Sequence, residues 1–180
     1  AGGKSVVVIE KGEPKSCNIV TSCEGKGKTF IMFSDDLDKA LATFVLANGA
    51  AATGQKVTIF FTFWGLNVIK KLHKPNVEKD IFGKMFGMML PSSSRKLKLS
   101  KMSMGGIGGK MMRYIMNRKG IDSLESLRQQ ALENGVEFIA CQMSMDVMGV
   151  KQEELLDEVT IGGVATYMER ADNANINLFI

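Results

Sequence analysis

TFIMFSDDLDKALATFVLANGAAATGQKVTIFFT, residues 29–62, decides the fold of this chain. It begins with a continuous apolar run over 29–33 and ends with a second one over 56–62, and both runs are typical of buried strands. Between them, residues 34–36 (Ser-Asp-Asp) offer capping side chains and first-turn negative charge, and apolar residues then recur at helical spacing as far as Gly54. A buried strand, a helix and a second buried strand form a βαβ unit, which predicts a parallel sheet with a right-handed crossover.

The remainder of the chain continues this alternation after an interruption. Pro75, Pro91 and the glycines of 105–109 mark residues 74–109 as an insertion with hinges. The pattern beyond it predicts helices over 110–119, 123–134, 153–157 and 164–174, and strands over 136–140 and 176–180. We therefore expect an α/β fold, a three-layer sandwich with a mainly parallel sheet and a ligand crevice at the carboxyl ends of its strands.

Length and composition favour one ordered domain. The chain has 180 residues, of which 45% are hydrophobic and only three are proline. Residues 1–28 are rich in Gly and Lys and are expected to be a tail, a linker or the remnant of a preceding module, ahead of an α/β domain over 29–180.

Cysteine usage and hydropathy bear on the compartment. Three cysteines, an odd number at low density, favour a reducing environment. The apolar run over 6–9 is too short for a secretory signal, and no run approaches the roughly 20 residues that a membrane span needs. We expect a cytoplasmic protein without a transmembrane segment.

The net charge of +4 is unevenly distributed. Residues 81–121 contain nine basic residues and no Asp or Glu, and 11 of the 13 methionines lie between Met85 and Met148. A basic, Met-rich segment can be core, a protein-docking face or a peripheral membrane contact. We favour an oligomer or partner contact near the crevice, and nucleic acid is disfavoured because aromatic residues for base stacking are sparse.

Cys141 is the principal candidate for chemistry. It ends the expected strand over 136–140, and the stretch Gln142–Gly149 after it can form a helix. A cysteine between a strand and a helix N-terminus suits a reactive thiolate, because the helix dipole and the unpaired N–H groups favour the anion. The alternative is a small core hydrophobe, since free cysteine is among the most buried residue types.

Four motifs together resemble the DsrE-like sulfurtransferase family, in particular its DsrE/DsrF/DsrH-like branch with a Met-rich insertion. The motifs are Phe63-Trp64-Gly65-Leu66-Asn67, residues 99–108, Ala140-Cys141-Gln142 with the residues up to Gly149, and residues 162–167. The resemblance covers residues 28–180. It implies a flavodoxin-like sheet, homo-oligomers, and a cysteine at position 141 that carries sulfane sulfur as a persulfide or thiosulfonate. TusA-like or rhodanese-like carriers are the partners it implies, with small donors such as thiosulfate as a further source.

Other residues are assigned supporting or structural roles. Ser34, Trp64, Asn67 and Gln142 are expected to shape the crevice. Cys17 and Cys23 have five residues between them, a wider spacing than in a zinc pair, and only His73 could join them, so no metal is expected. The glycines of 105–109 lack the Gly-Lys-Ser/Thr ending of a phosphate loop and are interpreted as a hinge, and no cofactor is expected.

The function expected is that of a sulfur-trafficking protein with a single carrier cysteine, a sulfurtransferase or sulfur carrier. Two alternatives remain. In the first, the chain is a non-catalytic oligomeric module that docks a flavin-dependent disulfide reductase, and Cys141 is buried and unreactive. In the second, it is a thiol-disulfide redox protein, which requires Cys17 or Cys23 to approach Cys141.

Overall fold

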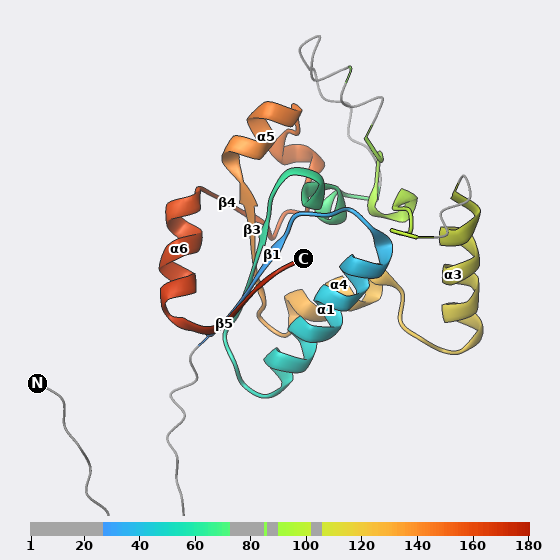
Figure 1. The fold of residues 1–180 in the computed structure, drawn as a ribbon, viewed down its shortest axis with the longest axis horizontal. Helices are drawn as coiled ribbons and strands as arrows, with labels where there is room; N and C mark the ends of the chain where they lie inside the picture. The colour runs from blue at the N-terminus through green and yellow to red at the C-terminus, as the bar shows by residue number, and fades with distance from the viewer. Residues whose placement is uncertain (1–26, 73–84, 86–89, 102–105) are drawn as a thin grey trace, which may run out of the picture.

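A five-stranded, all-parallel sheet with the strand order β4-β3-β2-β1-β5 forms the centre of the molecule in the computed structural model (Figure 1). The strands are β1 (Gly27–Met32), β2 (Val57–Phe61), β3 (Glu137–Cys141), β4 (Thr160–Gly162) and β5 (Ala174–Phe179). The structure describes residues 27–72, 85, 90–101 and 106–180. The parallel order of these five strands confirms the predicted α/β fold class with a parallel sheet.

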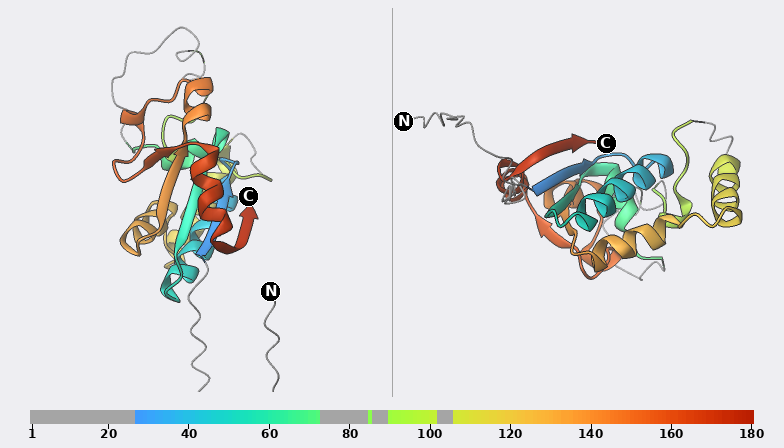
Figure 2. Two further views of the ribbon diagram at one scale, coloured as in Figure 1. Left: turned by 90° about the vertical axis from the view of Figure 1, so that its left-hand side faces the viewer. Right: turned by 90° about the horizontal axis from the view of Figure 1, so that it is seen from below.

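Helices cover both faces of the sheet, as Figure 2 shows. Helices α1 (Leu37–Ala52) and α4 (Leu124–Glu133) pack side by side on one face, and α6 (Val164–Asp172) lies on the other. Helix α5 (Gln142–Met148) follows β3 directly at the carboxyl end of the strands, and α3 (Ile107–Arg118) lies beyond α1 and α4 at the edge of the molecule. Among the described residues, the short 3-10 helices η1 (Phe63–Ile69), η2 (Ser94–Lys96) and η4 (Gln152–Glu154) connect these elements.

The core is divided unequally between the two faces. The larger cluster lies under α1 and α4, and its rings Phe44, Phe61 and Phe138 have centroids 5.3 to 6.4 Å apart. The smaller cluster, under α6, contains Phe60, Ile139, Cys141 and Tyr167. Among the side chains of α6, only that of Tyr167 is buried. The face of the sheet under α6 is therefore much more thinly covered than the face under α1 and α4.

Several expected elements differ in detail. β4 was not predicted, since three residues are too few for a periodic pattern, and the segment expected to be helical over 153–157 is the shorter η4. Ile107, Gly108 and Gly109 belong to the first turn of α3, so the predicted hinge over 105–109 is wrong at these three positions. Most of the insertion, Cys17, Cys23 and His73 lie outside the described residues.

Candidate functional site

Cys141 is the last residue of β3 and the residue that caps α5. Its backbone is extended, with φ −71° and ψ 114°, and α5 begins with the next residue. The thiol is free and only 1% of the residue is exposed. The predicted position between strand and helix is therefore confirmed, but the sulfur lies in the core and not in an open crevice.

Cys141 belongs to the small apolar cluster on the face of the sheet that α6 covers. Tyr167 packs its ring on that of Phe60, with centroids 5.1 Å apart, and its hydroxyl lies 3.2 Å from the Thr29 hydroxyl. Ile31 and Ala171 complete the apolar surroundings. With only 1% of the residue exposed, the thiol is closed to a sulfur donor in this structure.

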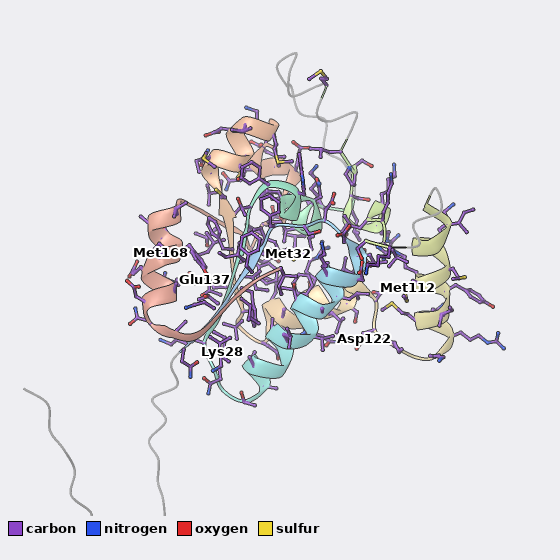
Figure 3. All side chains as sticks on the ribbon, in the orientation of Figure 1. Lys28, Met32, Met112, Asp122, Glu137 and Met168 are labelled. Atoms are coloured by element: carbon purple, nitrogen blue, oxygen red, sulfur yellow. The ribbon has the colours of Figure 1, made fainter. Side chains whose placement is uncertain are left out.

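One ion pair holds the other end of α6. Nε and Nη2 of Arg170 donate to the two carboxylate oxygens of Glu137 at 2.9 and 3.2 Å, and Thr58 donates to the same carboxylate. The bond from Arg170 is the main reason that the pKa of Glu137 lies below its usual value. Figure 3 shows Glu137 and Met168 on the α6 side of the molecule, with Met112 and Asp122 on the α3 side. Among the described residues, the Arg170–Glu137 pair and Tyr167 thus hold α6 against the sheet, and α6 has no other buried side chain.

A second polar group lies at the carboxyl ends of β1 and β2. Asn67 is fully buried in η1, and its Nδ2 donates to Asp35 Oδ2 at 3.0 Å. Burial raises the pKa of Asp35 above its ordinary value, and the bond from Asn67 offsets only part of that effect. The side-chain oxygen of Asn67 is buried and has no hydrogen-bond partner among the described residues.

The turn between β2 and η1 fixes this corner. Phe63 has a φ of +46°, in the left-handed region, and the N–H of Gly65 donates to the Phe33 carbonyl at 2.8 Å. A Cβ built on Gly65 would lie 1.9 Å from the Met32 carbonyl oxygen, so only glycine fits. The two strand ends are thereby held in direct backbone contact.

The predicted crevice residues lie at this edge of the sheet but do not surround the thiol. Ser34 donates to Asp36 at 2.8 Å, and Gln142 donates to Asp146 at 3.0 Å on the exposed side of α5. Trp64 is 40% exposed in η1. None of these three, nor Asn67, belongs to the cluster around Cys141. Whether they act on a ligand stays a prediction.

The sequence did not reveal which residues are buried in one cluster with Cys141. Tyr167 lies in one of the four family motifs and was assigned no role. The residues Val164, Tyr167, Met168 and Ala171 nevertheless recur at helical spacing and so indicate one face of a helix. Phe60 and Ile139 were assigned only to buried strands. Their alternation along the strands was not used to decide which face each side chain occupies.

Part of the basic segment over 81–121 is described, and it includes α3. Helix α3 and helix α6 are at opposite ends of the molecule in Figures 1 and 2. The expectation that the basic segment contacts an oligomer or partner near the crevice stays a prediction. No group of three or more metal-ligating side chains occurs within the described ranges, and none of the helices described there has the length and hydropathy of a membrane span.

Comparison with known proteins decides the family. The sequence model of the DsrE/DsrF/DrsH-like family matches residues 25–179. The chain belongs to this family. The uncharacterized protein YrkE of Bacillus subtilis (strain 168) is 44% identical over 155 residues, which cover 86% of this chain and 97% of YrkE.

Two further similarities agree with this assignment. The sulfur carrier protein DsrE2 of Allochromatium vinosum is 38% identical over 161 residues, which cover 87% of this chain and 99% of DsrE2. The crystal structure of the YchN protein from E. coli matches with a TM-score of 0.51 at 11% identity, over 86% of this chain and 99% of YchN. At that identity the similarity to YchN shows the fold alone.

Proposed function

We propose that this DsrE-like protein is a sulfur carrier that holds sulfane sulfur on Cys141. The observation that carries the proposal is the placement of Cys141 at the carboxyl end of a central strand, directly before α5, in a chain that is similar to DsrE2 over nearly the whole length of that sulfur carrier. Family membership over residues 25–179 supports it, because Cys141 is the one cysteine in that range.

The proposed reaction is thiol–persulfide exchange. The Cys141 thiolate attacks the terminal sulfur of a donor persulfide, a new S–S bond forms on Cys141, and the donor leaves as a thiolate. An acceptor thiolate then attacks the terminal sulfur of the Cys141 persulfide and releases the Cys141 thiolate. The S–S bonds formed and broken balance, so neither oxidant nor reductant is consumed. A TusA-like or rhodanese-like protein would serve as donor or acceptor in a reducing, cytoplasmic setting.

Access to the thiol would depend on α6. Because that helix is held by Tyr167 and by the Arg170–Glu137 pair, its opening costs less than unfolding of the α1 and α4 face. A docked partner that stabilises the open position would thus obtain the sulfur. Thiol exchange would be slow in its absence.

Exposed apolar residues on the same side of the molecule support a homo-oligomer. β5 is an edge strand whose outer edge is free of other described strands, and large apolar residues on β5 and α6 are 40 to 68% exposed: Val164, Met168, Ile176, Leu178 and Phe179. A long, apolar edge strand normally requires a cover. We propose a second copy of the chain as that cover.

Mass spectrometry tests the carrier role. Incubation with a persulfidated carrier or thiosulfate should add one sulfur to the Cys141 peptide, and tetrathionate should leave the thiosulfonate Cys–S–S–SO3⁻ with release of thiosulfate. Reduction should remove both adducts. Cys141→Ser should abolish them, and the double control Cys17→Ser/Cys23→Ser should retain them. A Cys141→Ser variant that acquires the same adduct elsewhere would disprove the assignment.

The burial of Cys141 favours a second candidate, a non-catalytic oligomeric module that docks a flavin-dependent disulfide reductase. That role requires an inert thiol, and Cys141, which is only 1% exposed, meets the requirement. Alkylation of the native protein separates the two functions, because a module without chemistry would label only on global unfolding. The redox alternative would need Cys17 or Cys23, so activity that survives removal of residues 1–26 would exclude it.

A further inference from the structure

A small cleft between α3 and the η2 segment has an entirely cationic and apolar lining. It has a volume of about 200 Å³ and is lined by Arg95, Lys96, Leu97, Lys98, Gly106, Gly109, Lys110 and Arg113. Five of these eight residues are basic and none is acidic. Like charges gathered around one concave space repel one another and raise the local concentration of anions.

The backbone around the cleft is open to a ligand because glycines form one wall. Gly106 caps α3 with a φ of +95° and supplies no capping side chain to the first turn. A Cβ built on Gly109 would lie 3.3 Å from the Leu97 carbonyl oxygen, so a side chain there would crowd the backbone at this wall of the cleft. The helix has 12 residues, and the positive end of its dipole adds to the field of the cations.

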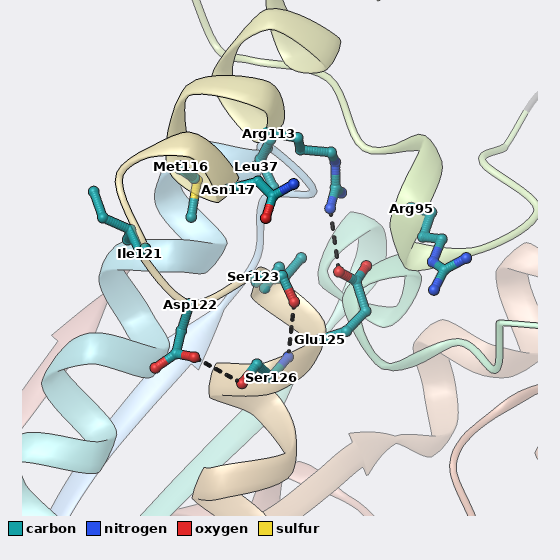
Figure 4. A pocket seen from close by; sticks show the side chains of 12 residues that line it. Leu37, Arg95, Arg113, Met116, Asn117, Ile121, Asp122, Ser123, Glu125 and Ser126 are labelled. Atoms are coloured by element: carbon teal, nitrogen blue, oxygen red, sulfur yellow. Dashed lines mark hydrogen bonds and ion pairs between the residues drawn. The ribbon is translucent and has the colours of Figure 1, made fainter.

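The cations of the cleft are not neutralised by the described residues around it, except for Arg113. That guanidinium donates to Glu125 at 3.2 Å and to the Ser94 carbonyl at 3.0 Å. Glu125 lies in a neighbouring cavity of about 680 Å³, where Figure 4 shows the Arg113–Glu125 bond and the unbonded guanidinium of Arg95. For Arg95, Lys96, Lys98 and Lys110, no side-chain bond or ion pair with a described residue occurs.

We propose that this cleft binds a small tetrahedral oxyanion through Arg95, Lys98 and Lys110, with the first turn of α3 as its floor. Phosphate, sulfate and thiosulfate share the required charge and shape, and so does the phosphate of an anionic lipid. A lipid source fits the outer face of α3, where the exposed residues Ile107, Met111 and Tyr114 form an apolar stripe directed away from the body. The site is separate from Cys141, and the inference does not depend on the sulfur-carrier proposal.

Calorimetric titration with sulfate, phosphate and thiosulfate, against chloride at equal ionic strength, tests the soluble source. We expect saturable binding of one oxyanion per chain and a loss of affinity of about tenfold in Arg95→Gln, because one charge-assisted hydrogen bond is removed. Lys119→Gln, a matched charge loss at the other end of α3, should bind normally. Gly109→Ala retains every cation and should also weaken binding, whereas a diffuse basic surface would not respond to it. If circular dichroism shows that Gly109→Ala is unfolded, Arg95→Gln decides alone.

Co-sedimentation with vesicles tests the lipid source. Binding to phosphatidylglycerol vesicles but not to phosphatidylcholine vesicles, reduced about tenfold by Arg95→Gln and unchanged by Lys119→Gln, identifies the headgroup phosphate. Equal losses in Arg95→Gln and Lys119→Gln overturn the proposal, because the attraction is then a diffuse one. The proposal is also overturned if neither soluble oxyanions nor vesicles bind in an Arg95-dependent way.

Discussion

Replacement of Tyr167 by alanine should expose Cys141 without unfolding the rest of the domain. The Tyr167 ring is 6% exposed and lies 5.1 Å from the Phe60 ring. Removal of a buried aromatic side chain costs about 3 kcal/mol at a site of this kind. Since each 1.4 kcal/mol is a factor of ten, the population with α6 open should rise on the order of 100-fold.

Alkylation of Cys141 under native conditions measures this population. When reclosing is faster than labelling, the observed rate is the intrinsic thiol rate multiplied by the opening constant, so the rate should also rise on the order of 100-fold. Tyr167→Phe removes only the hydroxyl contact with Thr29 and should raise the rate about fivefold, as expected for a hydrogen bond of about 1 kcal/mol.

Two controls distinguish local opening from global unfolding. Met168→Ala changes an exposed neighbour on the same helix and should leave the rate unchanged. Leu124→Ala creates a cavity on the opposite face, where Leu124 is 1% exposed, and should lower global stability by about 3 kcal/mol with little effect on labelling. Equal acceleration by Tyr167→Ala and Leu124→Ala would refute the reasoning, because labelling would then require complete unfolding.

Three further predictions concern the turn after β2, the ion pair on α6 and the edge strand. Gly65→Ala should lower the free energy of unfolding by about 3 kcal/mol or more in urea titrations, because its Cβ meets a backbone carbonyl, whereas Gly49→Ala, with open space inside α1, should raise it by about 0.5–1 kcal/mol. Because the folded-state pKa of Glu137 is lowered from 4.5, its contribution to stability is present above that value and is lost as the pH falls through the folded pKa. The protection of α6 against hydrogen exchange, measured relative to the intrinsic exchange rate at the same pH, should therefore fall below about pH 4.5 in the native protein and much less in Arg170→Gln, and an identical pH dependence of protection in the two proteins would contradict this assignment. Phe179→Glu, which places a charge on the exposed end of β5, should shift sedimentation toward the monomer, and Lys119→Glu, at the end of α3 on the opposite side of the molecule, should not.

The sequence predicted those parts of the fold that are encoded by long periodic or apolar runs. The helix over 37–52 and the strands on either side were found because their side chains are buried in the larger cluster. β4 has only three residues and is exposed or half-buried, so its position depends on pairing with β3 and has no local signal. The glycines at 108 and 109 were interpreted as part of a hinge, yet both lie in the first turn of α3, and Gly109 allows that helix to approach Leu97 closely. The cysteine was located correctly in the chain, but it is buried in a cluster that also contains Tyr167, 26 residues later, and a cluster across that separation cannot be obtained from spacing alone.

The burial of Cys141 gives the proposed carrier a means of selecting its partner. A persulfide in open solvent loses its terminal sulfur to any small thiol, because exchange requires only access and a thiolate. A persulfide beneath α6 would be protected in proportion to the closed population, and a docked acceptor that favours the open position would receive the sulfur. The loss of sulfur from persulfidated Cys141 to a small thiol should then rise in Tyr167→Ala by the same factor as alkylation of the free thiol. If the two factors differ widely, α6 does not control access to the sulfur, and the protection of the carrier must come from another element around β3.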